Sequence, residues 1–307
     1  MDRLTTGHAE LAGAHHRRIT VNGVTLHVAE IGSGPPVLLV HGFPQHWYAW
    51  HRVAVDLARD HRVLMPDMRG FGWSETTARG YDTGTRVDDL EALIEALDLG
   101  PVTVCGHEWG AWAGFMLALR SPHRVRGLVA LNVQHPWPRH RRLLPSAWRY
   151  GYTALLEQPL LGRQVLRRWP AYTRWLLERG RHGIDPTDAH AYAQVLRQPE
   201  RARAGEALHR AFVFGDIVRL ATNRYRRMRI DVPTVLLGGR HDRVTSPRAI
   251  EAVHPEQPML DVRILEGGHY LHERAPQCVA TTIREIEERG SRVLHGATGT
   301  DSGVREP

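Results

Sequence analysis

Short apolar runs recur along the first 132 residues of the chain, and they predict β-strands. Residues 17–21 and 25–29 flank Asn22 and Gly23, which tolerate positive φ and therefore favour a tight hairpin. A continuous apolar run, typical of a strand buried on both faces, follows at residues 37–40, and residues 62–65 repeat this pattern more weakly. Residues 102–105 and 125–131 are predicted to be the third and fourth buried strands.

Apolar positions at helical spacing fill the intervals between these runs. Val87, Leu90, Ile94 and Leu97 recur every three or four residues, and a Gly-Pro pair at residues 100–101 ends that helix. Strands and helices in alternation, joined by short loops, favour a mostly parallel sheet with helices on both faces. The sequence therefore predicts an α/β fold.

This alternation stops at about residue 135. Residues 135–230 are rich in Arg and aromatic residues and contain helical patterns without a convincing buried strand. Strand patterns resume at residues 232–237 and 261–265, and a helix follows from about residue 275 to 288. We therefore expect a discontinuous core (1–134 and 231–290), a helical cap (135–230) and a disordered tail (291–307).

Composition excludes several kinds of chemistry. All 40 basic residues are Arg, so the chain has no lysine for a Schiff base, for pyridoxal phosphate or for a phosphate-binding loop. Cys105 and Cys278 provide neither a disulfide framework nor a four-sulfur zinc site. The histidines at 269 and 272 lack further ligands at usable spacing. We expect no metal and no cofactor.

Charge is unevenly distributed along the chain. Residues 135–230 hold 19 Arg and 7 acidic residues, although the net charge of the whole chain is only +7. No recognition helix, zinc finger or RNA-binding signature accompanies these arginines, so we expect no nucleic-acid partner. No apolar run approaches the ~20 residues of a membrane helix, and the first 18 residues lack the apolar stretch of a signal peptide. We expect a cytoplasmic protein that does not bind membranes. The sequence leaves open whether it forms a homodimer.

The first candidate for chemistry is Glu108, in the segment Gly-His-Glu-Trp-Gly-Ala at residues 106–111. A small-x-acid-x-small pattern between a buried strand and a helix is typical of a nucleophile elbow. Small neighbours are needed because the central residue lies on a strained, tight turn. We expect this turn to present Glu108 at the carboxyl edge of the sheet.

Other candidates follow other strands, at the same edge of the sheet. Residues 41–44 (His-Gly-Phe-Pro) follow a strand, and the N–H groups of Phe43 and Trp109 would form an oxyanion hole. Asp242 and His269 each come just after a strand end, in the chain order nucleophile, acid, base. His269 is the candidate base, and Asp242 would hold its tautomer.

These motifs allow a resemblance to be stated. The chain resembles the α/β-hydrolase superfamily, and within it the epoxide hydrolase and haloalkane dehalogenase branch, over roughly residues 18–290. The segments at residues 41–44 (HGFP), 67–74 (DMRGFGWS) and 106–111 (GHEWGA) match its motifs in order. The resemblance implies an α/β-hydrolase fold with an inserted helical cap, and a hydrolase that needs no cofactor.

Two cap tyrosines distinguish epoxide hydrolases within this branch. Tyr152, seven residues before Pro159, resembles the first, and Tyr225, just before the core resumes, resembles the second. A carboxylate displaces the strained C–O bond of the epoxide and forms an ester, while the two phenols hydrogen-bond the epoxide oxygen and supply its proton. Water activated by His269 then attacks the ester carbonyl. We expect an epoxide and water as substrates, with His41, Trp109, Tyr152 and Tyr225 in contact with the epoxide.

One residue departs from the pattern of the family. The nucleophile of the family is normally Asp, whereas position 108 is Glu, which adds roughly 1.5 Å of reach. Glu108 is then a nucleophile in a reshaped pocket, a general base or electrostatic group in a related reaction, or part of an inert binding site. A haloalkane dehalogenase and a ligand-binding relative stay open, and a role in natural-product biosynthesis is consistent with the unusual Glu.

Overall fold

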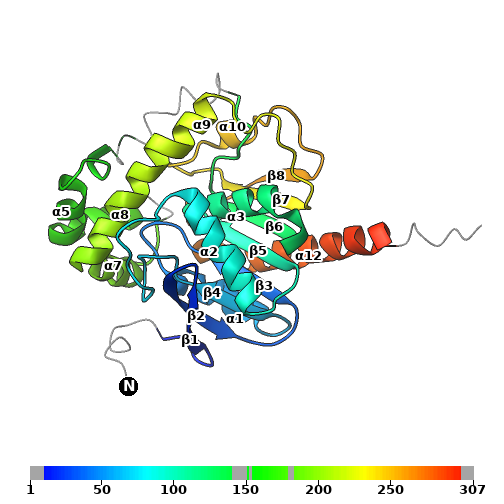
Figure 1. The fold of residues 1–307 in the computed structure, drawn as a ribbon, viewed down its shortest axis with the longest axis horizontal. Coiled ribbons are helices and arrows are strands. Elements are labelled where there is room, and N and C mark those ends of the chain that lie inside the picture. The colour runs from blue at the N-terminus through cyan, green and yellow to red at the C-terminus, as the bar shows by residue number, and fades with distance from the viewer. Residues whose placement is uncertain (1–9, 140–150, 152–153, 179–182, 299–307) are drawn as a thin grey trace, which may run out of the picture.

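The computed structural model describes residues 10–139, 151, 154–178 and 183–298. An eight-stranded sheet runs through the centre of the molecule in the order β1-β2-β4-β3-β5-β6-β7-β8 (Figure 1). The strands are β1 (His15–Val21), β2 (Val24–Ile31), β3 (Pro36–Val40), β4 (Arg62–Pro66), β5 (Val102–His107), β6 (Val125–Leu131), β7 (Thr234–Gly239) and β8 (Leu260–Leu265).

The first two strands form the predicted hairpin, since Val21 pairs with Val24 and both turn residues have positive φ. β2 is also antiparallel to β4, whereas the remaining neighbouring pairs, from β4–β3 to β7–β8, are parallel. The central strands β3, β5 and β6 are almost entirely buried, as their continuous apolar runs indicate. The prediction of a mostly parallel α/β sheet is confirmed.

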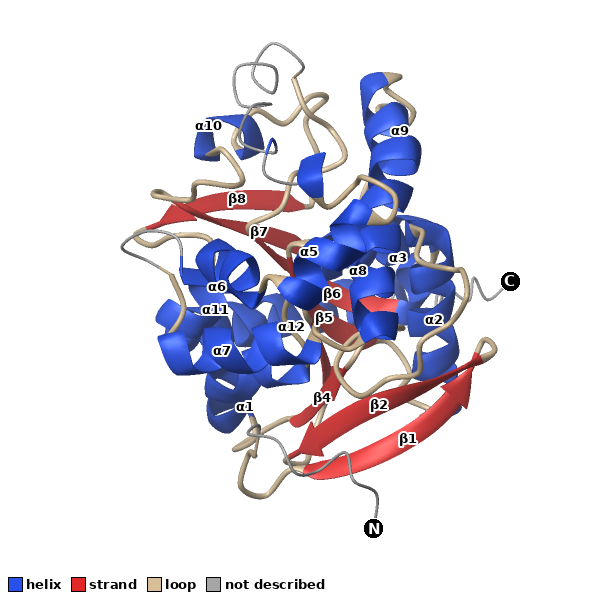
Figure 2. Ribbon diagram, turned by 90° about the vertical axis from the view of Figure 1, so that its left-hand side faces the viewer, coloured by secondary structure: helices blue, strands red, loops and turns tan. Residues whose placement is uncertain are grey.

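Helices pack on both faces of this sheet (Figure 2). α2 (Thr83–Ala96) and α3 (Trp109–Arg120) bury their apolar residues against one face, and α1 (His51–Leu57) and α12 (Pro276–Thr298) bury theirs against the other. Shorter segments complete the core: η2 (Trp47–Trp50), η3 (Pro122–Arg124), α10 (Pro247–Ile250) and α11 (Leu271–Arg274). Two hydrophobic cores therefore hold the carboxyl edge of the sheet in place.

Further helices lie between β6 and β7 in the sequence, and we call them the cap. They are α5 (Leu161–Arg168), α6 (Pro170–Glu178), α7 (Pro186–Val195), α8 (Pro199–Ala211), the π-helix η5 (Phe212–Ile217) and α9 (Val218–Ala221). Proline begins α7 and α8, where its missing N–H has no helical partner to lose. α8, η5 and α9 continue into one another as one long helix (Figure 1).

The C-terminal helix is longer than the sequence predicts. α12 continues to Thr298, so residues 291–298 are helical and the tail expected from residue 291 does not begin there. The apolar positions of α12 keep their helical spacing to about Val293 and contact the sheet as far as Ile286. Among the described helices, none is both long and apolar enough to cross a membrane.

We predict that Gly290→Ala destabilises the protein, although the same exchange usually favours a helix. A Cβ atom at Gly290 would lie 2.1 Å from the carbonyl oxygen of Arg126, because α12 packs directly on the backbone of β6. The free energy of unfolding should fall by about 1–3 kcal/mol in chemical denaturation.

The matched control is Gly215→Ala in the π-helix, where the Cβ would meet only the end of the Arg219 side chain at 3.7 Å. This control should leave the free energy of unfolding unchanged to within about 0.5 kcal/mol, or raise it slightly. Equal effects of the two exchanges would contradict the close contact between α12 and β6.

Candidate active site

Glu108 lies on a sharp turn between β5 and α3. Its backbone angles are φ 50° and ψ −113°, a conformation that non-glycine residues rarely adopt. The turn is tied on both sides, because the Glu108 N–H donates to the Leu131 carbonyl and the Glu108 carbonyl accepts from the Trp112 N–H. The strand–turn–helix expected of a nucleophile elbow is confirmed.

The flanking glycines explain how this turn fits into the fold. A Cβ at Gly106 would lie 2.5 Å from the Ala111 nitrogen, and one at Gly110 would lie 2.1 Å from the Val40 carbonyl oxygen. Both positions therefore exclude any larger residue. The elbow is built by close backbone contact between β3, β5 and α3.

The carboxyl group of Glu108 faces the two N–H groups that the sequence assigns to an oxyanion hole. The Phe43 N–H donates to Oε2 at 2.7 Å, and the Trp109 N–H donates to the same oxygen at 3.4 Å. No group of the described residues donates to Oε1. A Cβ at Gly42 would lie 2.8 Å from both Cβ and Oε2 of Glu108, so a side chain at residue 42 would collide with this acid. One carboxyl oxygen is thus held, and the other is left for chemistry.

His269 and Asp242 meet beside this turn. His269 Nδ1 lies 3.0 Å from Asp242 Oδ2, which also accepts from the Asn132 side-chain amide at 2.8 Å. The other oxygen of Asp242 accepts from the N–H groups of Val244 and Thr245. Since Asp242 is buried and fully hydrogen-bonded, it fixes the imidazole with Nε2 directed away from the carboxylate.

Burial changes the protonation of both catalytic candidates. Burial raises the pKa of Glu108 to about 7, although His269 and the two N–H donors favour the charged form. Burial by itself lowers the pKa of His269, but the charge and hydrogen bond of Asp242 and the charge of Glu108 outweigh it and raise this pKa. The opposing influences show that the acid and the imidazole lie within electrostatic range of each other.

His41, in the loop that leads to Phe43, makes hydrogen bonds to backbone groups. Its Nε2 accepts from the Met68 N–H at 3.0 Å, and its Nδ1 therefore donates to the Gly42 carbonyl at 3.0 Å. Both ring nitrogens are occupied by backbone groups, so His41 has none to offer a substrate. His41 thus holds the loop before Phe43 through its ring nitrogens, and its contact with a substrate stays a prediction.

Trp109 packs under the cap. Its ring meets Phe212 of η5 at 4.4 Å between ring centroids, and its buried indole N–H has no partner among the described residues. The cap thus covers the elbow directly. A buried N–H without a partner is costly and is available to a bound molecule.

The two cap tyrosines have different outcomes. Tyr152 lies outside the described residues. Tyr225 is buried, packs edge-on against Trp112 and donates its hydroxyl proton to Asp216 Oδ1 at 3.2 Å. Burial and the charge of Asp216 raise the pKa of this phenol to about 12. The Tyr225 hydroxyl is therefore hydrogen-bonded to Asp216, an interaction that the sequence did not indicate.

Sequence reasoning also missed two charged residues beside the elbow. Arg86 of α2 is 2% exposed and donates to the Trp109 carbonyl at 3.4 Å. Asp216 of η5 is 1% exposed and accepts from the Thr83 hydroxyl at 2.6 Å. A signal for Arg86 was present, because it lies four residues before Leu90 and seven before Leu93, in phase with the apolar face of its helix.

A family model matches most of the chain. Residues 35–276 match the family model described as "alpha/beta hydrolase fold". The chain belongs to this family. The chain is 41% identical over 128 residues to "Epoxide hydrolase 2" of Siraitia grosvenorii and 37% identical over 118 residues to "Soluble epoxide hydrolase" of Corynebacterium sp. (strain C12). These matches cover 39% and 38% of this α/β hydrolase, and only 40% and 41% of the relatives.

Solved structures match this α/β hydrolase over most of its length. The epoxide hydrolase VrEH1 from Vigna radiata has a TM-score of 0.77 and 26% identity, over 91% of this chain and 99% of that one. A putative epoxide hydrolase from Pseudomonas aeruginosa has a TM-score of 0.78 and 26% identity, over 92% and 98%. The hydrolase fold thus extends through nearly the whole chain.

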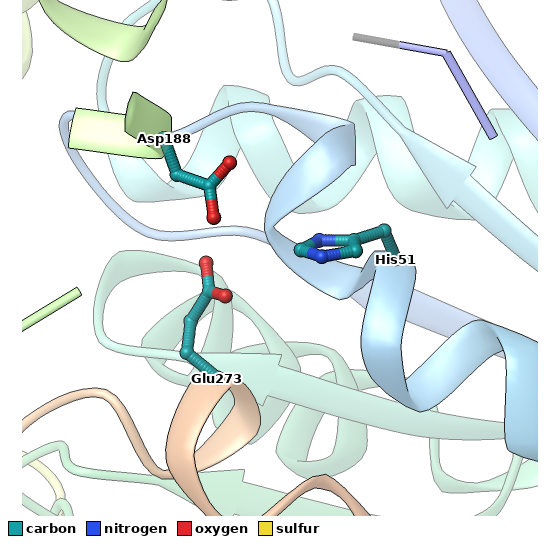
Figure 3. A group of neighbouring side chains, drawn as sticks. All are labelled: His51, Asp188 and Glu273. Atoms are coloured by element: carbon teal, nitrogen blue, oxygen red, sulfur yellow. The ribbon is translucent and has the colours of Figure 1, made fainter. Parts of the chain in front are cut away.

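A second group of titratable side chains lies at the contact between cap and core, away from Glu108. Figure 3 shows the carboxyl groups of Asp188 and Glu273 facing each other, with the His51 ring beside them. Their potential ligand atoms lie within 4.8 Å of one another. The Arg52 guanidinium already approaches both acids, at 3.9 Å from Asp188 and 3.5 Å from Glu273. Because this cation already offsets the charge of both acids, we assign no metal site here.

We predict that Glu108 is a titrating acid near neutral pH. Infrared difference spectra recorded across pH should show a protonated carboxyl band that disappears with a midpoint of about 7, because burial favours the neutral form. Glu273 contributes a second band, since burial raises its pKa to about 8.

The variants Glu108→Gln and Glu273→Gln separate these two bands. The band with the lower midpoint should be absent in Glu108→Gln and present in Glu273→Gln. Loss of neither band in Glu108→Gln would mean that this carboxyl group stays ionised throughout.

Proposed function

We propose that this α/β hydrolase is an epoxide hydrolase that opens an epoxide to a vicinal diol through an ester on Glu108. The observation that carries the proposal is the position of Oε2, which accepts from the Phe43 and Trp109 N–H groups and leaves Oε1 for attack. The similarity to curated epoxide hydrolases supports the same reaction class. A role in natural-product biosynthesis is part of this proposal.

The first step is alkylation of Glu108. Oε1 of the ionised carboxylate attacks one epoxide carbon, and the strained C–O bond breaks, leaving its electron pair on the epoxide oxygen. A phenol of the cap, Tyr225 or Tyr152, donates its proton to this oxygen as charge develops. The products are a hydroxyalkyl ester on Glu108 and a phenolate, which later recovers a proton.

The second step is hydrolysis of that ester. His269 takes a proton from water, and the resulting hydroxide attacks the carbonyl carbon of Glu108. The negative charge moves to Oε2, where the N–H groups of Phe43 and Trp109 stabilise it. The intermediate collapses by breaking the bond between the carbonyl carbon and Oε1, the alkoxide takes the proton from His269, and the diol leaves with Oε1. Glu108 is left as a carboxylic acid, and its proton returns through water to the phenolate, which restores both groups.

Charge couples the two steps. Esterification removes the negative charge of Glu108, which is one of the influences that raise the pKa of His269. This pKa therefore falls once the ester has formed, which favours the neutral imidazole that a base needs. Formation of the ester on Glu108 thus favours the form of His269 that hydrolyses this ester.

Tyr225 needs to leave Asp216 to act on the substrate. Its hydrogen bond to Asp216 is 3.2 Å long, whereas O–H···O bonds to a carboxylate are usually about 2.5–2.7 Å. A bond this long is weak, and the epoxide oxygen competes with it for the same proton. Asp216 then holds the phenol in place until a substrate arrives.

Haloalkane dehalogenation is a second candidate, favoured by the unpartnered indole N–H of Trp109. Such a donor next to the nucleophile suits a departing halide. The two candidates share the ester on Glu108 and differ in the leaving atom. Diol formation from an epoxide without halide release from a haloalkane favours the first.

We predict that one turnover in water enriched in heavy oxygen labels Glu108 before it labels the diol. The hydroxide attacks the carbonyl of the ester, so the first diol carries an oxygen that belonged to Glu108. Mass spectrometry of the peptide that contains residue 108, and of the diol, measures both labels. Glu108→Gln should reduce turnover by at least about 10³-fold while it folds normally.

A labelled diol from the first turnover, with no label in the protein, would instead make Glu108 a general base. Substrate-free enzyme in the same water serves as the control for exchange.

We predict that Tyr152→Phe combined with Tyr225→Phe lowers kcat by about 10²-fold or more, because no acid then protonates the epoxide oxygen. The melting temperature should change little, since both rings are kept. Tyr172→Phe, a cap tyrosine that packs between Trp169 and Trp175, is the control and should retain normal kinetics. Normal kinetics in the double variant would remove the argument for an epoxide as substrate.

A further inference from the structure

Arg86 brings a positive charge into the protein interior beside Glu108. Arg86 is 2% exposed, because it lies near the start of α2 on the side of the helix that is buried. Its Nη1 donates to the carbonyl of Trp109, the residue that follows the candidate nucleophile. Among the acids, Glu108 exerts the strongest electrostatic influence on it. The guanidinium therefore lies at the elbow.

This guanidinium is almost without partners. The bond to Trp109 is long, at 3.4 Å, and it engages one of five N–H donors. The buried Nε–H has no partner among the described residues. Burying a cation is costly unless it is paired and hydrogen-bonded, and this guanidinium forms one long hydrogen bond and no ion pair among the described residues.

The neighbouring acids offset part of the charge of Arg86 through space, but none of them forms an ion pair with it. Asp89 is held by the Arg69 guanidinium and the Asn22 amide. Asp216 accepts from Arg219, as well as from the hydroxyls of residues 83 and 225. Each acid thus already has its own partners.

Glu108 is not the missing partner either. Its Oε2 is directed to the Phe43 and Trp109 N–H groups, and no ion pair joins it to Arg86. Arg86 is also the weakest of the main influences on the pKa of Glu108, which burial still raises to about 7. The pKa of Arg86 itself, which burial lowers to about 10, leaves the guanidinium charged at neutral pH.

We propose that Arg86 binds a carboxylate group of the substrate, so that the chain acts on epoxides that carry a carboxylic acid. This proposal rests on the proposed function, whose site it extends. A planar guanidinium with free N–H groups matches the two oxygens of a carboxylate.

The carboxylate also explains why a cation is placed at this point. An anionic substrate that approaches an ionised Glu108 is repelled, and the repulsion is strong in a buried site. A positive charge close to Glu108 offsets this repulsion. Arg86 would therefore raise affinity for acids and reject neutral epoxides that leave its N–H groups unpaired.

The kinetic test compares epoxides that differ only in charge. The substrates are 3-phenylglycidate and 3-phenylglycidamide, with a longer-chain epoxy acid and its amide as a second pair. The wild-type enzyme should have the higher kcat/KM for each acid. Arg86→Met should lower the acid-to-amide ratio by about 10- to 100-fold, which corresponds to the ~1.5–3 kcal/mol of a hydrogen bond to a charged group.

Two further variants complete the kinetic comparison. Arg86→Lys keeps the charge and loses the planar fork, so the ratio should fall by a smaller factor; it also serves if Arg86→Met does not fold. Arg224→Met removes an exposed cap arginine and should leave the ratio unchanged. An equal ratio in the wild type, Arg86→Met and Arg86→Lys overturns the proposal, because Arg86 would then be only structural.

A binding test separates this proposal from the proposed function. Calorimetry on Glu108→Gln, with 3-phenylpropanoate and 3-phenylpropanamide as probes, needs no turnover. Tighter binding of the acid that disappears with Arg86→Met supports the anion site even if no epoxide is opened, in which case the proposed function alone fails. Equal affinity for acid and amide overturns the anion site, whatever the enzyme turns over.

Discussion

The strained backbone of Glu108 is the feature on which the rest of the site depends. A non-glycine residue with φ 50° is stable here only because glycine on either side lets β3, β5 and α3 approach to backbone contact. This turn aims the carboxyl at the Phe43 N–H and sets the Trp109 N–H beside it. A side chain at residue 42 would collide with the Glu108 side chain, so the glycine there is needed as well. The elbow thus depends on close contacts that only glycine allows.

Burial then determines the charges that this geometry brings together. It raises the pKa of Glu108, whereas Asp242 keeps the neighbouring imidazole of His269 basic. In the proposed reaction, the ester on Glu108 carries no negative charge, so the pKa of His269 falls. Arg86 adds a cation that the protein itself leaves unpaired. A buried site with one held acid and one unpaired cation is suited to a substrate that carries its own negative charge.

The cap completes the site through few but buried contacts. The π-helix η5 carries Phe212, whose ring packs on Trp109, and Asp216, which binds both the Thr83 hydroxyl of the core and the Tyr225 phenol of the cap. π-Helical turns are uncommon and frequently occur at functional sites. This one turn carries both the aromatic ring that packs on Trp109 and the carboxylate that binds α2 and Tyr225. Core and cap are therefore joined at the candidate reacting groups.

The sequence alone determined the strands, the hairpin, the elbow and the order Glu108, Asp242, His269, because each depends on a local pattern or on a strand end whose position in a parallel sheet follows from topology. Tertiary structure determined which groups each side chain contacts. His41 is occupied by backbone groups, Tyr225 binds Asp216, and Arg86 reaches the elbow from another helix. These contacts depend on the tertiary fold. A local sequence pattern does not indicate which side chains the fold brings together, or how deeply it buries each of them.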